Sequence, residues 1–241
     1  MQFHPFARRL LALVLTAAFM TTAALSGFAV YAMPIQAAYP QESIYLFDAD
    51  TGEALVEQNP DLPRCVASLT KMMTALLVLE SGTDLSAGIT IPASLTPELQ
   101  SIRANRGHTI GLQAGETVRR IDMMYAMLLP SANDAASVIA SDVSDGDLTA
   151  FVARMNQKAA ELGMTATHFC NPTGLHDPEH VSTVRDMARL TEAALQNETF
   201  RKLFTTERYT VPATNCHPQG FTMHSTLLSL SLIHISEPTR H

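Results

Sequence analysis

Residues 66–80 read VASLTKMMTALLVLE, in which a serine and a lysine stand three positions apart and an almost unbroken apolar run follows. Residues i and i+3 lie on one face of a helix, about one turn apart, so the Lys71 ammonium comes within reach of the Ser68 hydroxyl. The apolar run leaves the helix almost no polar side, which predicts a helix buried in the core. The rest of the chain is therefore expected to pack around this stretch.

The position of Lys71 at the mouth of a buried helix has a chemical consequence. Partial burial disfavours the charged ammonium, and a neutral lysine can take the proton of a neighbouring serine, which makes the hydroxyl a nucleophile. Backbone N–H groups at the helix N-terminus also favour negative charge that develops near Ser68. The plainer interpretation is a Ser68 helix cap beside a lysine placed there by chance, and the pair alone favours it.

The composition fits one globular domain of ordinary size, or a domain and a fragment. The chain has 241 residues, of which 46% are hydrophobic, and it lacks tryptophan, so the core should be mostly aliphatic and methionine. Sixteen Lys and Arg residues against 23 Asp and Glu give a net charge of −7, without a basic cluster, which argues against a nucleic-acid partner.

Three cysteines, Cys65, Cys170 and Cys216, leave two interpretations open. One disulfide and one free thiol would suit an exported protein, and small buried apolar side chains would suit any protein. None of the three has the spacing of metal ligands, and we expect no cofactor.

Residues 1–32 are expected to form a secretory signal peptide. Arg8 and Arg9 make a short positive region, residues 10–32 carry no charge, and small residues precede Met33. An uncleaved anchor is the alternative, because the apolar run is long enough to span a bilayer. Export predicts a location in the periplasm or at the extracytoplasmic cell surface, with membrane contact only through this segment.

A linker at residues 33–42 is followed by strand and helix patterns. Residues 92–110 form a polar, proline-bearing segment, and turn residues at 111–117 lead into a helix. We expect strands at 43–47, 54–57, 89–91 and 207–211, and helices at 118–129, 135–143, 147–162, 182–195 and 200–204. Helices in the middle and strands near the ends suit an α+β sandwich whose sheet is made by the two chain ends.

A polar stretch at residues 131–134 interrupts two apolar helices. Pro130 breaks the first helix, and the side chains of Ser131, Asn133 and Asp134 must then find partners. A helix corner is the plainer interpretation, in which Ser131 caps the second helix and Asn133 or Asp134 adds to the cap.

Together, the S-x-x-K at 68–71, the Ser131-x-Asn133 triplet and the export pattern resemble class A β-lactamases and penicillin-binding proteins. The sequence is most similar to the D-alanyl-D-alanine carboxypeptidases, the low-molecular-weight penicillin-binding proteins of serine peptidase family S11. The matching stretches are ASLTKMMT at 67–74, GLQAGE at 111–116, LLPSANDAA at 128–136 and NPTGLHD at 171–177. The resemblance covers residues 43–226, the expected catalytic domain, and implies an α+β, transpeptidase-like fold with a helical cluster against an antiparallel sheet.

The resemblance implies a role for each of four residues. Ser68 attacks the carbonyl between the two terminal D-alanines of a peptidoglycan stem peptide, and Lys71 is its general base. Ser131 helps to pass the proton to the leaving D-alanine. Asn133 hydrogen-bonds the substrate amide and holds the Lys71 side chain. Water then hydrolyses the acyl-enzyme without a cofactor or metal, and β-lactams acylate Ser68 as substrate mimics.

One motif of the family does not occur in the sequence. Lys-Thr-Gly, which in the family binds the substrate carboxylate and helps to form the oxyanion hole, is absent. Residues 217–226 resemble the lead-in to it, whereas residues 227–241 resemble nothing in the family and are expected to be a non-native tail. The implied consequences are a sheet incomplete at the C-terminus and a truncated chain with little or no activity.

Two alternatives remain open. A class A β-lactamase-like hydrolase needs a deacylating glutamate, and Glu179 does not stand in the E-x-x-x-N arrangement of that class. A non-catalytic fragment that binds peptidoglycan or β-lactams is favoured by the missing Lys-Thr-Gly. His108, His176 and His180 receive no catalytic role and are expected in loops or at the surface.

Overall fold

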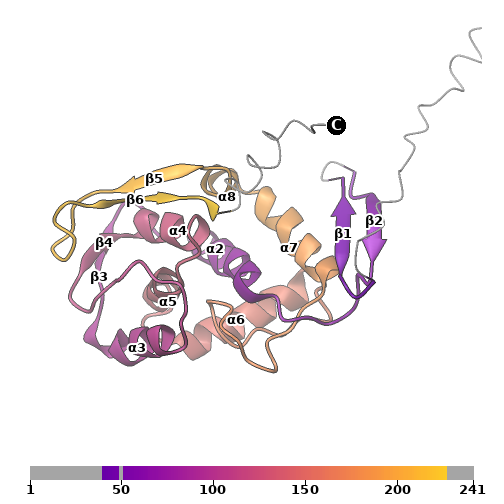
Figure 1. Cartoon of the computed structure of the whole chain (residues 1–241), viewed down its shortest axis with the longest axis horizontal. Helices are drawn as coiled ribbons and strands as arrows, with labels where there is room; N and C mark the ends of the chain where they lie inside the picture. Colours follow the sequence, from indigo (N-terminus) through magenta and orange to yellow (C-terminus); the bar gives the residue numbers. More distant parts are fainter. Residues whose placement is uncertain (1–39, 49–50, 227–241) are drawn as a thin grey trace, which may run out of the picture. The chain divides into compact units, whose positions relative to one another are not determined.

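Helix α2 (Thr70–Glu80) is the element against which most of the other helices pack (Figure 1). The computed structural model describes residues 40–48 and 51–226. Residues 70–78 of α2 are all buried, as the apolar run predicts. The helices in contact with α2 are α4 (Arg120–Leu128), α5 (Asn133–Asp142), α6 (Leu148–Glu161), α7 (Val184–Leu195) and α8 (Glu198–Phe204).

Side-chain caps explain where three of these helices begin. Asp147, Thr183 and Asn197 precede α6, α7 and α8, and each accepts a hydrogen bond of 2.9–3.1 Å from the backbone N–H three residues later. Gly163, with a φ of 69°, follows the end of α6, where the left-handed conformation suits glycine. The predicted helices 147–162 and 182–195 are thus confirmed to within two residues.

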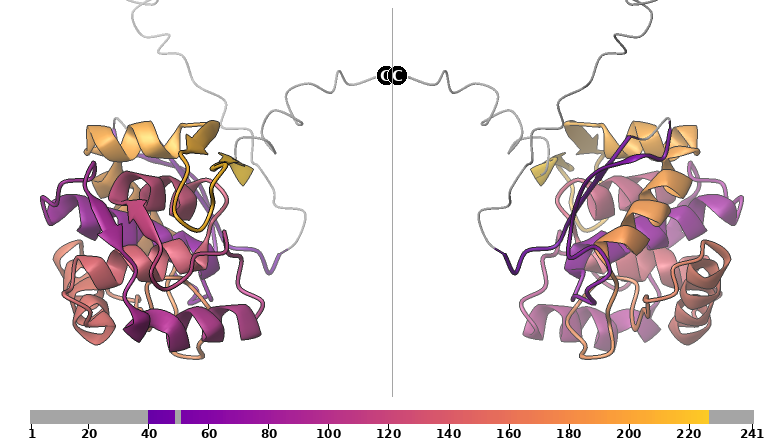
Figure 2. Two further views of the ribbon diagram at one scale, coloured as in Figure 1. Left: turned by 90° about the vertical axis from the view of Figure 1, so that its left-hand side faces the viewer. Right: turned by 90° about the vertical axis from the view of Figure 1, so that its right-hand side faces the viewer.

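The strands form three separate two-stranded antiparallel sheets in the described part of the chain. The pairs are β1 (Ile44–Phe47) with β2 (Ala54–Gln58), β3 (Gly88–Thr90) with β4 (Thr117–Arg119), and β5 (Arg208–Val211) with β6 (Phe221–His224). The α+β class is confirmed, but the prediction of one sheet made by both chain ends is wrong for these strands. Instead, β1 packs against α7, and Figures 1 and 2 show β5–β6 on the opposite side of the helical cluster from α3 (Thr96–Ala104).

One local prediction is also wrong, and one helix was not predicted. The helix expected at 118–129 begins only at Arg120, because Val118 pairs with Ile89 across β3 and β4. Helix α3 lies in the polar, proline-bearing segment at 92–110, for which no helix was predicted. A proline in its first turn suits a helix start, and Leu99 and Ile102, three positions apart, are buried beneath it.

The β5–β6 hairpin is fixed to α4 through one buried carboxylate. Asp122 is 1% exposed and accepts hydrogen bonds from Arg119 at 2.7 and 2.9 Å and from the Tyr209 hydroxyl at 2.8 Å. The Tyr209 ring stacks on Tyr125 with 3.7 Å between centroids. Burial and the bond to Asp122 raise the pKa of Tyr209 to about 12. After β6, the Thr226 backbone N–H donates to the Leu129 carbonyl at 3.1 Å.

Several predicted segments fall outside the described residues. These are the signal peptide at 1–32, residues 33–39 of the linker and the tail at 227–241. Within the described part, every helix is too short or too polar to span a bilayer.

Removing the Tyr209 hydroxyl tests whether its bond to Asp122 fixes the β5–β6 hairpin to α4. Tyr209→Phe keeps the stacked ring and loses the bond to Asp122, so the free energy of unfolding in urea should fall by about 1 kcal/mol. Tyr45→Phe is the matched control, because Tyr45 is half-buried in β1 and its ring lies beneath the Arg185 guanidinium. Equal stability of Tyr209→Phe and the unmodified chain would show that the bond between Tyr209 and Asp122 does not stabilise the fold.

Candidate active site

Ser68 and Lys71 meet at the start of α2. Ser68 is exposed in a single 3-10 turn, Ala67–Leu69, directly before the helix. Lys71 is 2% exposed, and its Nζ lies 3.1 Å from Ser68 Oγ and 2.7 Å from the backbone carbonyl of Thr173. The predicted contact between the serine and the lysine is therefore present, and the Ser68 hydroxyl remains open to a ligand.

The environment of Lys71 favours its neutral form. Burial lowers the pKa of Lys71 to about 8, and the negative charge of Asp134 opposes that shift. At pH 7 about one amine in ten is then unprotonated, against fewer than about one in a thousand for an exposed lysine. The predicted effect of burial on Lys71 is confirmed, and the amine is close to the range in which a general base operates.

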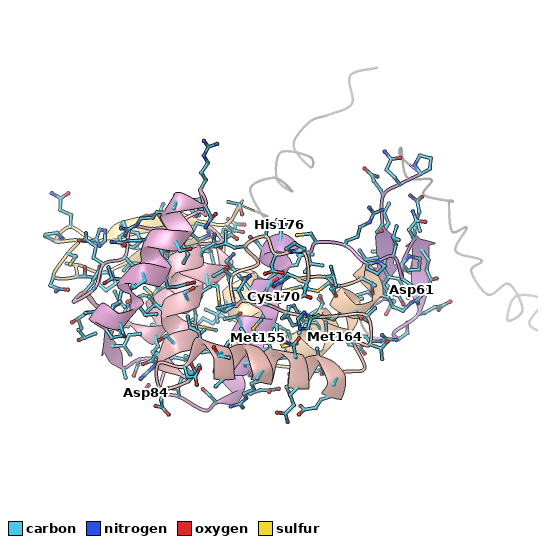
Figure 3. All side chains as sticks on the ribbon, turned by 90° about the horizontal axis from the view of Figure 1, so that it is seen from below. Asp61, Asp84, Met155, Met164, Cys170 and His176 are labelled. Carbon is cyan, nitrogen blue, oxygen red and sulfur yellow. The ribbon has the colours of Figure 1, made fainter. Side chains whose placement is uncertain are left out.

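The Thr173 carbonyl is presented to Lys71 by a turn at residues 171–174. Asn171 Oδ1 accepts hydrogen bonds from Thr173 and Gly174, and Thr74 Oγ1 donates to the Pro172 carbonyl at 2.7 Å. Gly174 has a φ of 80°, and a Cβ there would overlap the carbonyl oxygen of Ala67. The turn thus lies directly against the residues that carry Ser68. Figure 3 labels Cys170 and His176, which flank it.

Ser131 stands in a strained conformation with an unpaired hydroxyl. Its φ is +64°, a region costly for a residue with a side chain. Its Oγ is buried and has no hydrogen-bond partner among the described residues. Ser131 does not cap α5, since the cap residue is Ala132 and no side chain bonds there. Because buried polar groups are nearly always paired, this hydroxyl is available for a ligand or a reacting group.

One cavity brings three of the predicted residues together. Ser68, Lys71 and Ser131 line a cavity of about 280 Å³, whose other walls include Leu128 and Thr226. Its lining residues include neither a carboxylate nor a histidine. Two hydroxyls and an amine therefore share one largely apolar space, an arrangement suited to acyl transfer through a serine.

Asn133 lies next to this cavity but does not line it. It is the first residue of α5, 6% exposed, and its backbone N–H donates to the His108 carbonyl at 2.8 Å. Within residues 40–48 and 51–226 its side chain makes no hydrogen bond to Lys71, so the predicted contact is not found there. The next residue, Asp134, has a structural role that the sequence does not reveal.

The Asp134 carboxylate is held by backbone groups from two segments. It is 1% exposed, and burial raises its pKa, while the N–H donors around it oppose the shift. The donors, at 3.0–3.2 Å, are the backbone N–H groups of Ile110, Gly111, Leu112 and Ala135. Asp134 thereby fixes the turn at 110–112 beside Asn133 and places negative charge near Lys71. Only the turn signature of GLQAGE marked that segment in the sequence.

The remaining histidines and cysteines divide clearly. His108 and His176 are exposed and His180 lies in a loop, as expected, although the His180 side chain is buried, with 1% of it exposed. All three cysteines are free, so the interpretation with one disulfide is not borne out. Cys65 is exposed and the other two are half-buried, so the interpretation as buried apolar side chains is also wrong.

Comparisons with known proteins agree with this geometry. The sequence profile of peptidase S11, described as D-alanyl-D-alanine carboxypeptidase, matches residues 32–231. The D-alanyl-D-alanine endopeptidase of Pseudomonas aeruginosa is 36% identical over 179 residues, which are 74% of this chain and 55% of that protein. The D-alanyl-D-alanine carboxypeptidase DacF of Bacillus subtilis is 33% identical over 197 residues, 81% of this chain and 50% of that protein.

The fold has solved relatives as well. The crystal structure of a DD-transpeptidase from Streptomyces superposes with a TM-score of 0.70 at 30% identity, covering 77% of this chain and 74% of that one. This confirms the transpeptidase-like fold. The chain spans about half the length of the curated relatives it matches. With the family profile, the relatives and the Ser68–Lys71–Ser131 cavity in agreement, the chain belongs to serine peptidase family S11, the D-alanyl-D-alanine carboxypeptidases.

Proposed function

We propose that this chain carries the acylation centre of a serine-type D-Ala-D-Ala carboxypeptidase that trims peptidoglycan stem peptides. The observation that carries the proposal is the 3.1 Å approach of Lys71 Nζ to Ser68 Oγ, with the unpaired Ser131 hydroxyl in the same cavity. Membership of the family and the names of the relatives support the choice of substrate.

The reaction follows from the positions of these groups. Neutral Lys71 takes the Ser68 proton while the Thr173 carbonyl holds one of its N–H bonds. Ser68 Oγ forms a bond to the carbonyl carbon of the penultimate D-alanine, and the C–N bond to the last D-alanine breaks. The proton passes by way of Ser131 to the leaving amine, and Asn133 hydrogen-bonds the substrate amide. Water then cleaves the ester and restores Ser68.

A location outside the cytoplasm is part of the proposal. The charged, apolar and small-residue regions within residues 1–32 support export to the periplasm or the extracytoplasmic surface. The same segment is the only membrane contact proposed for this chain.

The β-lactamase-like alternative is less well supported. Glu179 is exposed and does not line the cavity, and the cavity contains no other carboxylate to activate a deacylating water. β-Lactams should therefore remain attached to Ser68 as a stable ester. The binding-fragment alternative rests on the absence of Lys-Thr-Gly from the sequence, for which reason we expect slow acylation and weak turnover.

Labelling with a fluorescent penicillin separates these functions. We expect the folded chain to be labelled slowly and stably, Ser68→Ala to remain unlabelled, and nitrocefin to be hydrolysed no faster than the label is lost. Rapid nitrocefin turnover that depends on Ser68 would identify a β-lactamase. A folded chain without Ser68-dependent labelling would support the binding fragment and overturn the proposal.

The pH dependence of labelling tests Lys71 as the base. Because the neutral amine takes the Ser68 proton and the pKa of Lys71 is about 8, the rate should rise from pH 6 with a midpoint near pH 8 and level off above about pH 9. Lys71→Arg keeps a charge at every pH in this range and should abolish labelling.

Lys158→Arg is the matched control. Lys158 lies in α6 and pairs with Glu80 and Glu161 rather than with Ser68, so the profile should keep its midpoint. A profile without a midpoint between pH 7 and 9 in the unmodified chain would rule out Lys71 as the base.

Ser131→Ala should separate activity from stability. The deleted oxygen has no partner, so the free energy of unfolding should stay the same or rise, whereas labelling should slow by about 100-fold as the proton relay is lost. Ser144→Ala should do the reverse. The Ser144 hydroxyl bonds to the Ala140 carbonyl outside the cavity, so its loss should cost about 1 kcal/mol and leave labelling unchanged. Labelling of Ser131→Ala at the unmodified rate would exclude Ser131 from the relay.

A further inference from the structure

His180 is a buried imidazole to which the proposed reaction gives no role. It is 1% exposed, and burial lowers the pKa of His180, which favours its neutral form. The backbone N–H of Cys170 donates to Nδ1 at 3.1 Å, and Nε2 lies 2.7 Å from Thr70 Oγ1. A backbone N–H only donates, so Nδ1 is the acceptor, and the proton of the neutral ring is on Nε2. His180 Nε2 therefore donates to the Thr70 hydroxyl.

Thr70 lies at the junction between the 67–69 turn and α2. It is the first residue of α2, is fully buried and stands between Ser68 and Lys71 in the chain. Its hydroxyl joins the start of α2 to the segment around residue 180, which also pairs with the chain before the turn through the Arg64 and Ser182 backbones. No other side chain among the described residues bonds to the Thr70 hydroxyl.

The backbone just before Ser68 requires such support. Ala67 has a φ of +45°, a left-handed conformation that costs on the order of 1 kcal/mol or more for a residue with a Cβ and persists only where the surroundings impose it. Two other contacts hold the same end of α2, from Lys71 to the Thr173 carbonyl and from Thr74 to the Pro172 carbonyl. Both lie on the helical side of Thr70, and the Arg64–Ser182 backbone pair lies before Ala67, so none of these bonds is made by residues 67–69 themselves.

We propose that His180 is a positioning residue of the acylation centre, which acts through Thr70 to hold the 67–69 turn so that Ser68 Oγ faces Lys71. The inference rests on the proposed function, since it concerns the acylation of Ser68. His180 touches neither the substrate cavity nor the reacting atoms. Its effect is confined to the geometry of the turn.

Two substitutions at His180 separate its two hydrogen bonds. In His180→Gln the side-chain amide nitrogen lies near the position of Nε2, so the donor to Thr70 is kept and the acceptor for Cys170 is lost. In His180→Asn the amide oxygen lies near Nδ1, so the acceptor is kept and the donor is lost. Each variant loses one buried hydrogen bond, so a purely structural role predicts similar losses of stability and similar labelling.

The positioning role predicts a different result for labelling. The second-order rate of penicillin labelling should stay within about threefold of the unmodified rate in His180→Gln and fall by about tenfold or more in His180→Asn, because one hydrogen bond is worth about a factor of ten. Equal rates in the two variants, or a slower rate in His180→Gln, would overturn the inference.

A double-mutant cycle checks that the effect passes through Thr70. Thr70→Val removes the hydroxyl at similar volume and should slow labelling about as much as His180→Asn. The double variant should be no slower than either single variant, because both remove the same interaction. Rates that multiply would show that His180 acts by another route.

A spectroscopic measurement keeps this test separate from that of the proposed function. Nitrogen-15 shifts of the imidazole at pH 7.5 should show a protonated Nε2 and an unprotonated Nδ1 for His180. The opposite tautomer overturns the inference even if Ser68 is labelled. A folded, unmodified chain that shows the expected tautomer but is not labelled overturns the proposed function and the inference with it.

Discussion

The buried amine of Lys71 is the constraint on which the rest of the site depends. Burial favours the neutral form, whereas the Asp134 charge favours the ammonium, and the balance brings the pKa to about 8. Either influence alone would fail, because a fully solvated lysine stays protonated at neutral pH and an uncompensated buried charge would destabilise the fold. The Thr173 carbonyl can accept a hydrogen bond from either form, so Lys71 can lose and regain a proton while its nitrogen stays beside Ser68.

The fold buries Lys71 by surrounding α2 with other helices. It also tolerates local strain in the backbone at the cavity. Ala67 and Ser131 both adopt left-handed backbone conformations, one just before the nucleophile and the other at the second hydroxyl. Ser131 also leaves its Oγ unpaired. Such features lower stability, and they persist because the surrounding packing over-determines the local conformation. The presence of both residues in the lining of one cavity fits the trade-off between stability and activity expected of an active site.

Local patterns in the sequence were sufficient for much of the fold and for the central pair of site residues. Each of the following features depends only on residues that are close together in the sequence: the apolar run of α2, the caps of α6 and α7, and the one-turn spacing of Ser68 and Lys71. What the sequence did not disclose depends on distant partners. Residues 117–119 form a strand because β3 lies beside them, and His180 is buried because α2 covers it. The bonds from Asp134 to the turn at 110–112 likewise have no local signature.

The contact between the 171–174 turn and α2 has a consequence for the order of events during folding. Lys71 and Thr173 are 102 residues apart in the sequence, and Thr70 and His180 are 110 apart. Contacts of such high sequence separation carry a large loop-closure entropy and form late. A chain that has made only its local helices already contains Ser68, but it lacks the carbonyl, the imidazole and the burial that set the chemistry of Lys71. The serine is thus an ordinary alcohol until the distant half of the domain has folded onto it, and its reactivity is a property of the finished tertiary structure.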